Sequence, residues 1–118
     1  SGGLGGVMFL KTNVASKANV VAMNAAFRAA APAGLPPYIT IDLDCLDPSF
    51  FPGTGTPESG GISFMDLLES ILKMSHLKVV GMDLNELSPM YDLSQASTAL
   101  ACKLTRESLI ALSLNRQK

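Results

Sequence analysis

Short, continuous apolar runs alternate along this chain with segments in which apolar residues recur at helical spacing. The runs are apolar on both faces, which is typical of strands buried inside a parallel sheet. We expect strands at residues 7–10, 38–43 and 77–84. We expect helices at residues 16–31, 63–74 and 93–114. This alternation of strands and helices predicts an α/β fold built on a parallel sheet.

More specific signals occur in the second and third predicted helices and in the loop that precedes the second helix. Ser63 can cap the second helix, with Asp66 as its capping-box partner. The third helix is expected to turn one apolar face to the core, formed by Ala96, Leu100, Leu104, Leu109 and Leu112. The prolines and glycines of residues 47–61 predict a long loop. A loop of this length inside a compact domain is more often functional than idle.

Asp42 and Asp44 stand one residue apart at the end of the second predicted strand. If the strand continues through both, alternation places them on the same face. Carboxylates this close repel each other, so the pair indicates a cation, and oxygen ligands favour Mg²⁺, Mn²⁺ or Ca²⁺ over a structural zinc. The same spacing also occurs in solvated loops and helix caps. Because Glu86 follows the next strand and ligands gather at the carboxyl ends of parallel strands, we favour a metal or cationic-ligand site.

Three other polar features near these acids allow more than one interpretation. Asp47, before Pro48, is expected to order the turn by accepting hydrogen bonds from loop amides rather than to touch a metal. Asp83 could be a ligand, but we favour a buried acid satisfied by hydrogen bonds. The Gly-Thr-Gly-Thr turn at residues 53–56 either shapes a substrate pocket or is a plain tight loop.

Composition excludes several functions. With 118 residues, 47% of them apolar and 16% charged, the chain is expected to form one domain with a real core. A net charge of −1 without basic runs argues against nucleic-acid binding. The apolar stretches end well before the roughly 18 residues that a membrane span needs. Cys45 and Cys102 lie too far apart for a zinc or redox motif and are expected to be buried as small hydrophobic residues.

Three motifs, in the same order, closely resemble those of the ureohydrolases, the family of arginases and agmatinases. They are residues 41–48 (Ile-Asp-Leu-Asp-Cys-Leu-Asp-Pro), residues 52–57 with Gly60 and Gly61, and residues 81–89 with Tyr91 and Asp92. The residues of these motifs look most like those of agmatinases and guanidino-acid hydrolases. Residues 38–114 match strongly and residues 1–37 weakly, so the chain resembles a single-domain segment from the C-terminal portion of such an enzyme. The resemblance implies a three-layer fold in which helices flank a parallel sheet.

The resemblance also implies an activity and a set of site residues. It implies manganese-dependent hydrolysis of a linear guanidino compound, such as agmatine, to urea and an amine, by attack of a metal-bridging hydroxide on the guanidinium carbon. Asp42 and Asp44 would bind two Mn²⁺ ions and Glu86 would bind the substrate guanidinium. No further catalytic residue is implied in this chain. The resemblance further implies a homo-oligomer, either a trimer or a hexamer, and a role in polyamine metabolism. It implies a cytoplasmic location, or a mitochondrial one in a eukaryote.

Part of the family's metal site has no counterpart in this sequence. The family adds a histidine after a glycine pair and an Asp-Ala-His-x-Asp segment, whereas the only histidine here, His76, is expected in a surface turn between a helix and a strand. The chain also begins at Ser1 without a methionine, which suggests an internal fragment or a processed chain. We therefore expect it to be inactive alone and to need an N-terminal part or a companion chain. The alternative is a non-catalytic scaffold or interaction module derived from the same fold.

Overall fold

The strands of the described chain form a parallel sheet with helices packed beside it. The computed structural model describes residues 7–9, 22, 25–26, 29 and 36–115. The strands are β1 (Val7–Phe9), β2 (Tyr38–Asp42) and β3 (Gly81–Asn85), paired in the order β1-β2-β3. The helices are α2 (Phe64–Met74) and α3 (Ala96–Asn115), with short 3₁₀ helices η2 (Leu43–Cys45) and η3 (Pro89–Tyr91). The parallel α/β class predicted from the sequence is confirmed, while most of the helix predicted at residues 16–31 lies outside the described residues.

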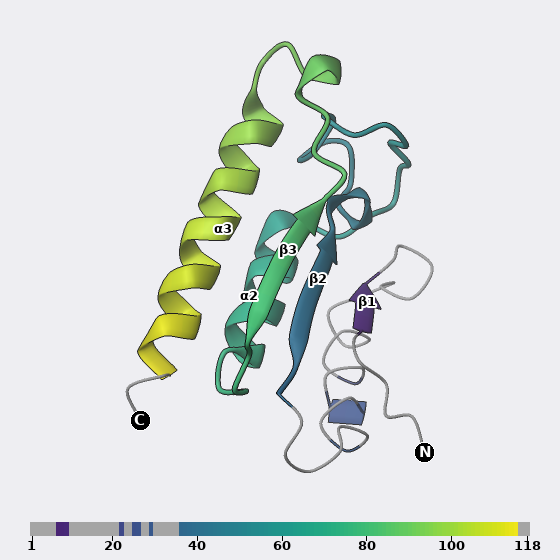
Figure 1. Ribbon diagram of the computed structural model, residues 1–118. Coiled ribbons are helices and arrows are strands. Elements are labelled where there is room, and N and C mark those ends of the chain that lie inside the picture. The colour runs from purple at the N-terminus through teal and green to yellow at the C-terminus, as the bar shows by residue number, and fades with distance from the viewer. Residues whose placement is uncertain (1–6, 10–21, 23–24, 27–28, 30–35, 116–118) are drawn as a thin grey trace.

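Strand β2 lies between the other two described strands, and its carboxyl end positions the candidate site. It pairs in parallel with β1 and with β3, and its last residue, Asp42, lies opposite Asn85, the last residue of β3. Ile39 and Ile41 of β2 are buried. Figure 1 shows η2, η3 and the long loop gathered beyond the carboxyl ends of β2 and β3, with α2 against these strands and α3 alongside α2.

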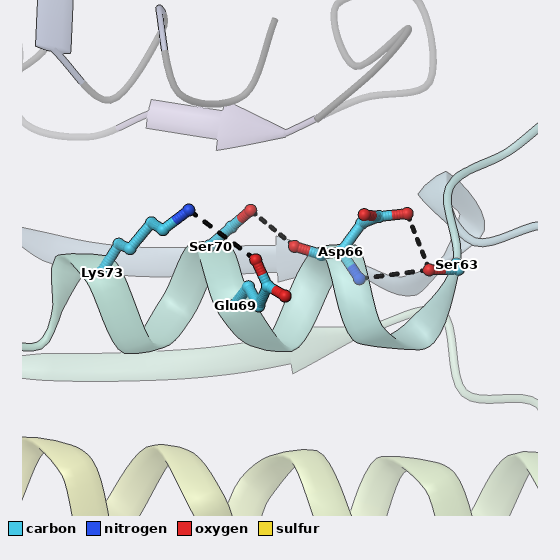
Figure 2. A network of polar contacts seen from close by, with 5 residues as sticks. All are labelled: Ser63, Asp66, Glu69, Ser70 and Lys73. Atoms are coloured by element: carbon cyan, nitrogen blue, oxygen red, sulfur yellow. Dashed lines mark hydrogen bonds and ion pairs between the residues drawn. The ribbon is translucent and has the colours of Figure 1, made fainter. Parts of the chain in front are cut away.

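Helix α2 begins where its sequence predicts. The Ser63 hydroxyl accepts the Asp66 backbone N–H at 3.2 Å and donates to the Asp66 carboxylate at 2.7 Å (Figure 2). This pairing satisfies one free N–H of the first turn and puts a negative charge at the positive end of the helix. On the outer side, Lys73 and Glu69 form an exposed ion pair at 3.7 Å, which contributes little to stability. The buried side carries Leu67, Leu68, Ile71 and Met74.

Strand β3 is shorter than the apolar run at 77–84 that predicts it, because it begins only at Gly81. The Leu77 N–H donates to the Met74 carbonyl at 2.9 Å, which makes the start of the run a turn that closes α2. Val79 is buried although it lies outside the strand. Its apolar character therefore reflects packing into the core and not sheet pairing.

Helix α3 begins at Ala96, three residues later than predicted, because the preceding segment forms a cap. The Asp92 carboxylate accepts the Ser94 N–H at 3.0 Å and the Ser97 N–H at 2.7 Å. Gln95 takes a left-handed conformation, with φ of 62°, as the chain enters the helix. Asp92, the last residue of the third motif, thus fixes the start of α3.

The core face of α3 differs from the predicted stripe. Leu104 is buried and Leu100 and Leu112 are partly buried, but Ala96 is exposed and Leu109 is 58% exposed. Besides Leu104, the buried residues of α3 are small, namely Ser97, Ala101 and Ser108. Small side chains let α3 approach its neighbours closely, and the two serines carry no hydrophobic signal in the sequence.

The two cysteines differ in burial. Cys45 is buried, as expected, whereas Cys102 is exposed, so the prediction that both are buried is wrong for Cys102. Cys102 follows the buried Ala101 on α3, and one helical step of about 100° turns it out of the contact surface. Among the described residues, no helix combines the length and the hydropathy needed to cross a membrane.

Gly61 is predicted to tolerate no side chain. A Cβ at Gly61 would lie 2.4 Å from the Asp47 backbone nitrogen and 2.5 Å from the Leu46 carbonyl carbon, and backbone atoms of this turn cannot move aside. We expect Gly61→Ala to lower the unfolding free energy of the complete protein by about 1–3 kcal/mol, as overpacking does. Gly55→Ala is the matched control, because its Cβ meets nothing within 4 Å. Equal unfolding free energies for both variants in chemical denaturation would contradict the close approach.

Thiol alkylation should separate the two cysteines. Cys45 is 1% exposed, and burial, together with the charges of Asp42 and Asp44, raises the pKa of its thiol to about 12. Its reactive thiolate is therefore scarcer, by roughly three orders of magnitude, than that of a thiol with the ordinary pKa of about 8.5. Peptide mapping by mass spectrometry after iodoacetamide treatment at pH 8 should find Cys102 modified and Cys45 modified only after unfolding. Rapid labelling of native Cys45 would show that this side of the sheet opens.

Candidate functional site

The acids singled out by the sequence gather at the carboxyl ends of β2 and β3. Asp42 ends β2 opposite Asn85, and Glu86 follows directly. The loop at residues 47–61 lies at the same edge (Figure 1). The structure thus brings the two strand ends together as the parallel sheet predicts.

Asp42 and Asp44 do not share a strand face, so the argument from strand alternation is wrong. Strand β2 stops at Asp42, and Asp44 lies in the 3₁₀ helix η2. Asp42 caps this turn, because its carboxylate accepts the Asp44 N–H at 3.0 Å. Both side chains are half-buried. The turn, and not the pleat of a strand, keeps these two acids beside each other.

The Asp44 carboxylate is held by two hydroxyl groups from the long loop. Thr54 donates to one of its oxygens and Thr56 to the other. The Thr56 N–H also donates to the Thr54 hydroxyl at 3.3 Å, which tightens the turn. The turn at residues 53–56 is therefore attached to the acid pair and is more than a plain tight loop. The repeated Gly-Thr pattern indicates the turn, but it does not predict the contact with Asp44.

Asp47 orders the loop, as its sequence position predicts. Its carboxylate accepts the Ser49 N–H at 2.9 Å and the Gly60 N–H at 2.8 Å, which ties the two ends of the loop together. Hydrogen bonds from Ser49, and then from Gly60, lower the Asp47 pKa to about 2. Since the folded pKa lies below the ordinary value of 3.8, this contribution to loop closure is present above about pH 4 and is lost as the pH falls toward 2.

Asp83 is satisfied by hydrogen bonds within the sheet, as predicted, although it is half-buried and not fully buried. Its carboxylate accepts the Thr40 hydroxyl at 2.6 Å and the Asn85 side-chain N–H at 2.6 Å. The hydrogen bond from Thr40, followed by one from Tyr38, lowers the pKa of Asp83. The hydrogen bond between Tyr38 and Asp83 also raises the pKa of Tyr38. Asp83 thus joins β2 to β3 beneath the site.

Glu86 marks a sharp change of direction at the end of β3. Its φ of 68° places a non-glycine residue in the left-handed region, which costs of order 1–3 kcal/mol and is commonest at functional sites. Its side chain is exposed. The backbone turn carries the chain out of the sheet beside the strand that ends in Asp42. No hydrogen bond in the described part of the chain defines what the Glu86 carboxylate binds.

The donor chemistry at this edge suits a hard divalent cation. Asp42 and Asp44 lie in one turn, where the Asp42 carboxylate accepts the Asp44 N–H, and the Asp44 carboxylate is held by neutral hydroxyls that leave its charge uncancelled. In the described part of the chain, no group of three or more His, Cys, Asp and Glu side chains could hold a metal by itself. His76 is exposed and lies between the end of α2 at Met74 and the start of β3 at Gly81, whereas Asp42 lies opposite the other end of β3. The described residues therefore fit as part of a metal site.

Comparison with known sequences finds similar proteins over much of the chain. The agmatinase of Halalkalibacterium halodurans is 50% identical over 80 residues, which cover 66% of this chain and 28% of the agmatinase. The human mitochondrial guanidino acid hydrolase is 49% identical over 79 residues, or 67% of this chain and 22% of that protein. The chain thus spans about a quarter of the length of these relatives.

Solved structures agree with the sequence comparison. The proclavaminate amidino hydrolase of Streptomyces clavuligerus matches 81% of this chain with 32% of its own, at a TM-score of 0.72 and 33% identity. The agmatine ureohydrolase of Thermoplasma volcanium matches 80% of this chain with 31% of its own, at a TM-score of 0.69 and 29% identity. Residues 5–111 also match the model of the Arginase family. With most of its length matched in sequence and in fold, this chain belongs to the arginase family.

Proposed function

We propose that the protein carrying this chain is a manganese-dependent ureohydrolase that cleaves a linear, agmatine-like guanidino compound to urea and an amine. Membership of the arginase family and the identity with agmatinases support the reaction class. The observation that supports a metal-dependent mechanism most directly is the adjacent carboxylate pair, Asp42 and Asp44, at the carboxyl end of β2.

Asp42 and Asp44 are the residues of this chain that would hold the Mn²⁺ ions. When bound, a manganese pair supplies an activated water for attack on a planar carbon. Asp44 contributes a carboxylate whose orientation is set by Thr54 and Thr56. Asp42 contributes a carboxylate that also closes the turn. The remaining ligands would come from an N-terminal part or a companion chain.

Glu86 would recognise the substrate. A guanidinium is a planar cation with N–H groups on its edge, and a carboxylate accepts charge-assisted hydrogen bonds from it. The left-handed backbone at Glu86 and its exposed side chain, at the same sheet edge as Asp42, support this role. Binding here would orient the guanidinium carbon toward the metal site.

We also propose that the complete protein is a homo-oligomer.

Substitutions in the complete protein should separate metal binding from substrate binding. Asp44→Ala should lose bound manganese and urea release from agmatine together, because a ligand is removed. Glu86→Ala should keep its manganese, while KM for agmatine rises about 10- to 100-fold, the equivalent of one hydrogen bond to a charged group. Elemental analysis and steady-state kinetics measure both.

Glu69→Gln is the matched control for these variants. Glu69 is an acid on the exposed side of α2, paired with Lys73, and its substitution should change neither manganese content nor kinetics. Normal manganese content in Asp44→Ala would overturn the ligand assignment. A complete protein that is manganese-free and inactive toward guanidino compounds would favour the non-catalytic scaffold instead.

A further inference from the structure

A buried threonine hydroxyl of the long loop donates a hydrogen bond to Asp44. Thr54 is 3% exposed, and its hydroxyl donates to the Asp44 carboxylate. A buried hydroxyl without a partner would be costly, so this contact constrains both side chains. Thr56 donates to the other oxygen of Asp44 but is exposed to solvent, where water can replace it. Thr54 is therefore the contact that sets the orientation of the carboxylate from inside the protein.

The backbone immediately before Thr54 is fixed at both of its polar groups. The Gly53 N–H donates to the Ser97 hydroxyl at 2.8 Å, and the Gly53 carbonyl accepts the Ser88 N–H at 2.8 Å. A Cβ at Gly53 would lie 2.7 Å from the Ser97 Cβ, so the loop passes directly against α3. This position leaves Thr54 little freedom to move away from Asp44.

Ser97 connects this loop to the cap of α3. It is 0% exposed, and its N–H donates to the Asp92 carboxylate at 2.7 Å. Hydrogen bonds from the hydroxyl of Ser94, and then from the backbone and hydroxyl of Ser97, lower the Asp92 pKa to about 2. The Ser97 hydroxyl can therefore accept from Gly53 while it donates to Asp92. Contacts run without a gap from Asp92 through Ser97 and Gly53 to the loop residue that holds Asp44.

We propose that Thr54 is a positioning residue, which orients the Asp44 carboxylate for Mn²⁺, and that Ser97 holds Thr54 in place through Gly53. The identity of the ion rests on the proposed function; the contacts do not. A carboxylate has about four lone-pair sites, so one hydroxyl on each oxygen leaves room for a cation. Neutral donors fix the direction of the carboxylate without neutralising it. Partners of this kind behind a metal ligand commonly change metal affinity 10- to 100-fold.

Mn²⁺ affinity of the metal-free complete protein, measured by isothermal titration calorimetry, tests the proposal. Thr54→Val keeps the shape and removes the hydroxyl, and it should weaken Mn²⁺ binding about 10- to 100-fold. Ser97→Ala removes the loop anchor and should weaken binding in the same direction. Thr54→Ser restores a hydroxyl and should recover most of the affinity, which loss of packing alone would not predict.

Ser108→Ala is the matched control for Ser97→Ala. Both serines are 0% exposed and lie on α3, but the Ser108 hydroxyl donates to the Leu104 carbonyl of its own helix at 2.7 Å. Its removal should leave Mn²⁺ affinity unchanged. Thermal unfolding of all four variants shows whether any loss of affinity follows a general loss of stability.

Crystal structures of the metal-free parent and of Thr54→Val provide a readout that needs no metal. The Asp44 carboxylate should leave its parent orientation in the variant. An unchanged Asp44 in Thr54→Val, or an unchanged Mn²⁺ affinity in both Thr54→Val and Ser97→Ala, would overturn the proposal. A parent that binds no Mn²⁺ would contradict the proposed function, while the metal-free structures would still decide whether Thr54 positions Asp44.

Discussion

The site depends on the long loop folding back onto the strand end from which it starts. The Ile62 N–H donates to the Cys45 carbonyl at 3.0 Å, and the Asp47 N–H donates to the Ile62 carbonyl at 3.1 Å. These bonds make a parallel bridge between Leu46 and Ile62, and Gly61 allows the two backbones to come this close. The closure returns the chain to the start of α2 and fixes both ends of the segment that carries Thr54.

The acids at this edge differ in the partners that hold them, and the difference suits different roles. Hydrogen bonds from the Ser49 hydroxyl, and then from the backbone N–H groups of Ser49 and Gly60, lower the Asp47 pKa to about 2, which matches an acid that serves the loop. Asp92, at the start of α3, is likewise held by a hydroxyl, that of Ser94, and by the backbone N–H groups of Ser94 and Ser97. Asp44 is held by the hydroxyls of Thr54 and Thr56, and its backbone N–H donates to the Asp42 carboxylate in the same turn. Two acids this close in one turn favour a bound cation, which supports the proposed metal site.

Local patterns predicted much of this fold because the residues that decide it are close in sequence. The cap at Ser63, the apolar face of α2 and the order of strands and helices all follow from nearby residues. The acids were predicted to meet at the strand ends, and the sheet register brings those ends together. The strand alternation failed, because Asp42 caps a turn that the apolar run does not reveal.

The remaining features depend on contacts between distant parts of the chain. The core face of α3 was predicted only in part, because several of its buried residues are small and Leu109, which was predicted to face the core, is exposed. The contact between Thr54 and Asp44 requires the loop closure, and the contact between Gly53 and Ser97 joins residues 44 positions apart. A pattern read along the chain cannot supply such pairings. They arise from the packing of α3 against the loop.

We propose that Asp42 and Asp44 form the part of a manganese site that this chain supplies. Anomalous diffraction at the manganese edge, from crystals of the complete protein grown with Mn²⁺, tests it most directly. Anomalous peaks should lie within about 2.0–2.6 Å of carboxylate oxygens of both acids, the range for bonds between hard cations and oxygen. Peaks elsewhere in the protein, or an Asp42 and Asp44 pair without manganese while other sites are filled, would contradict it.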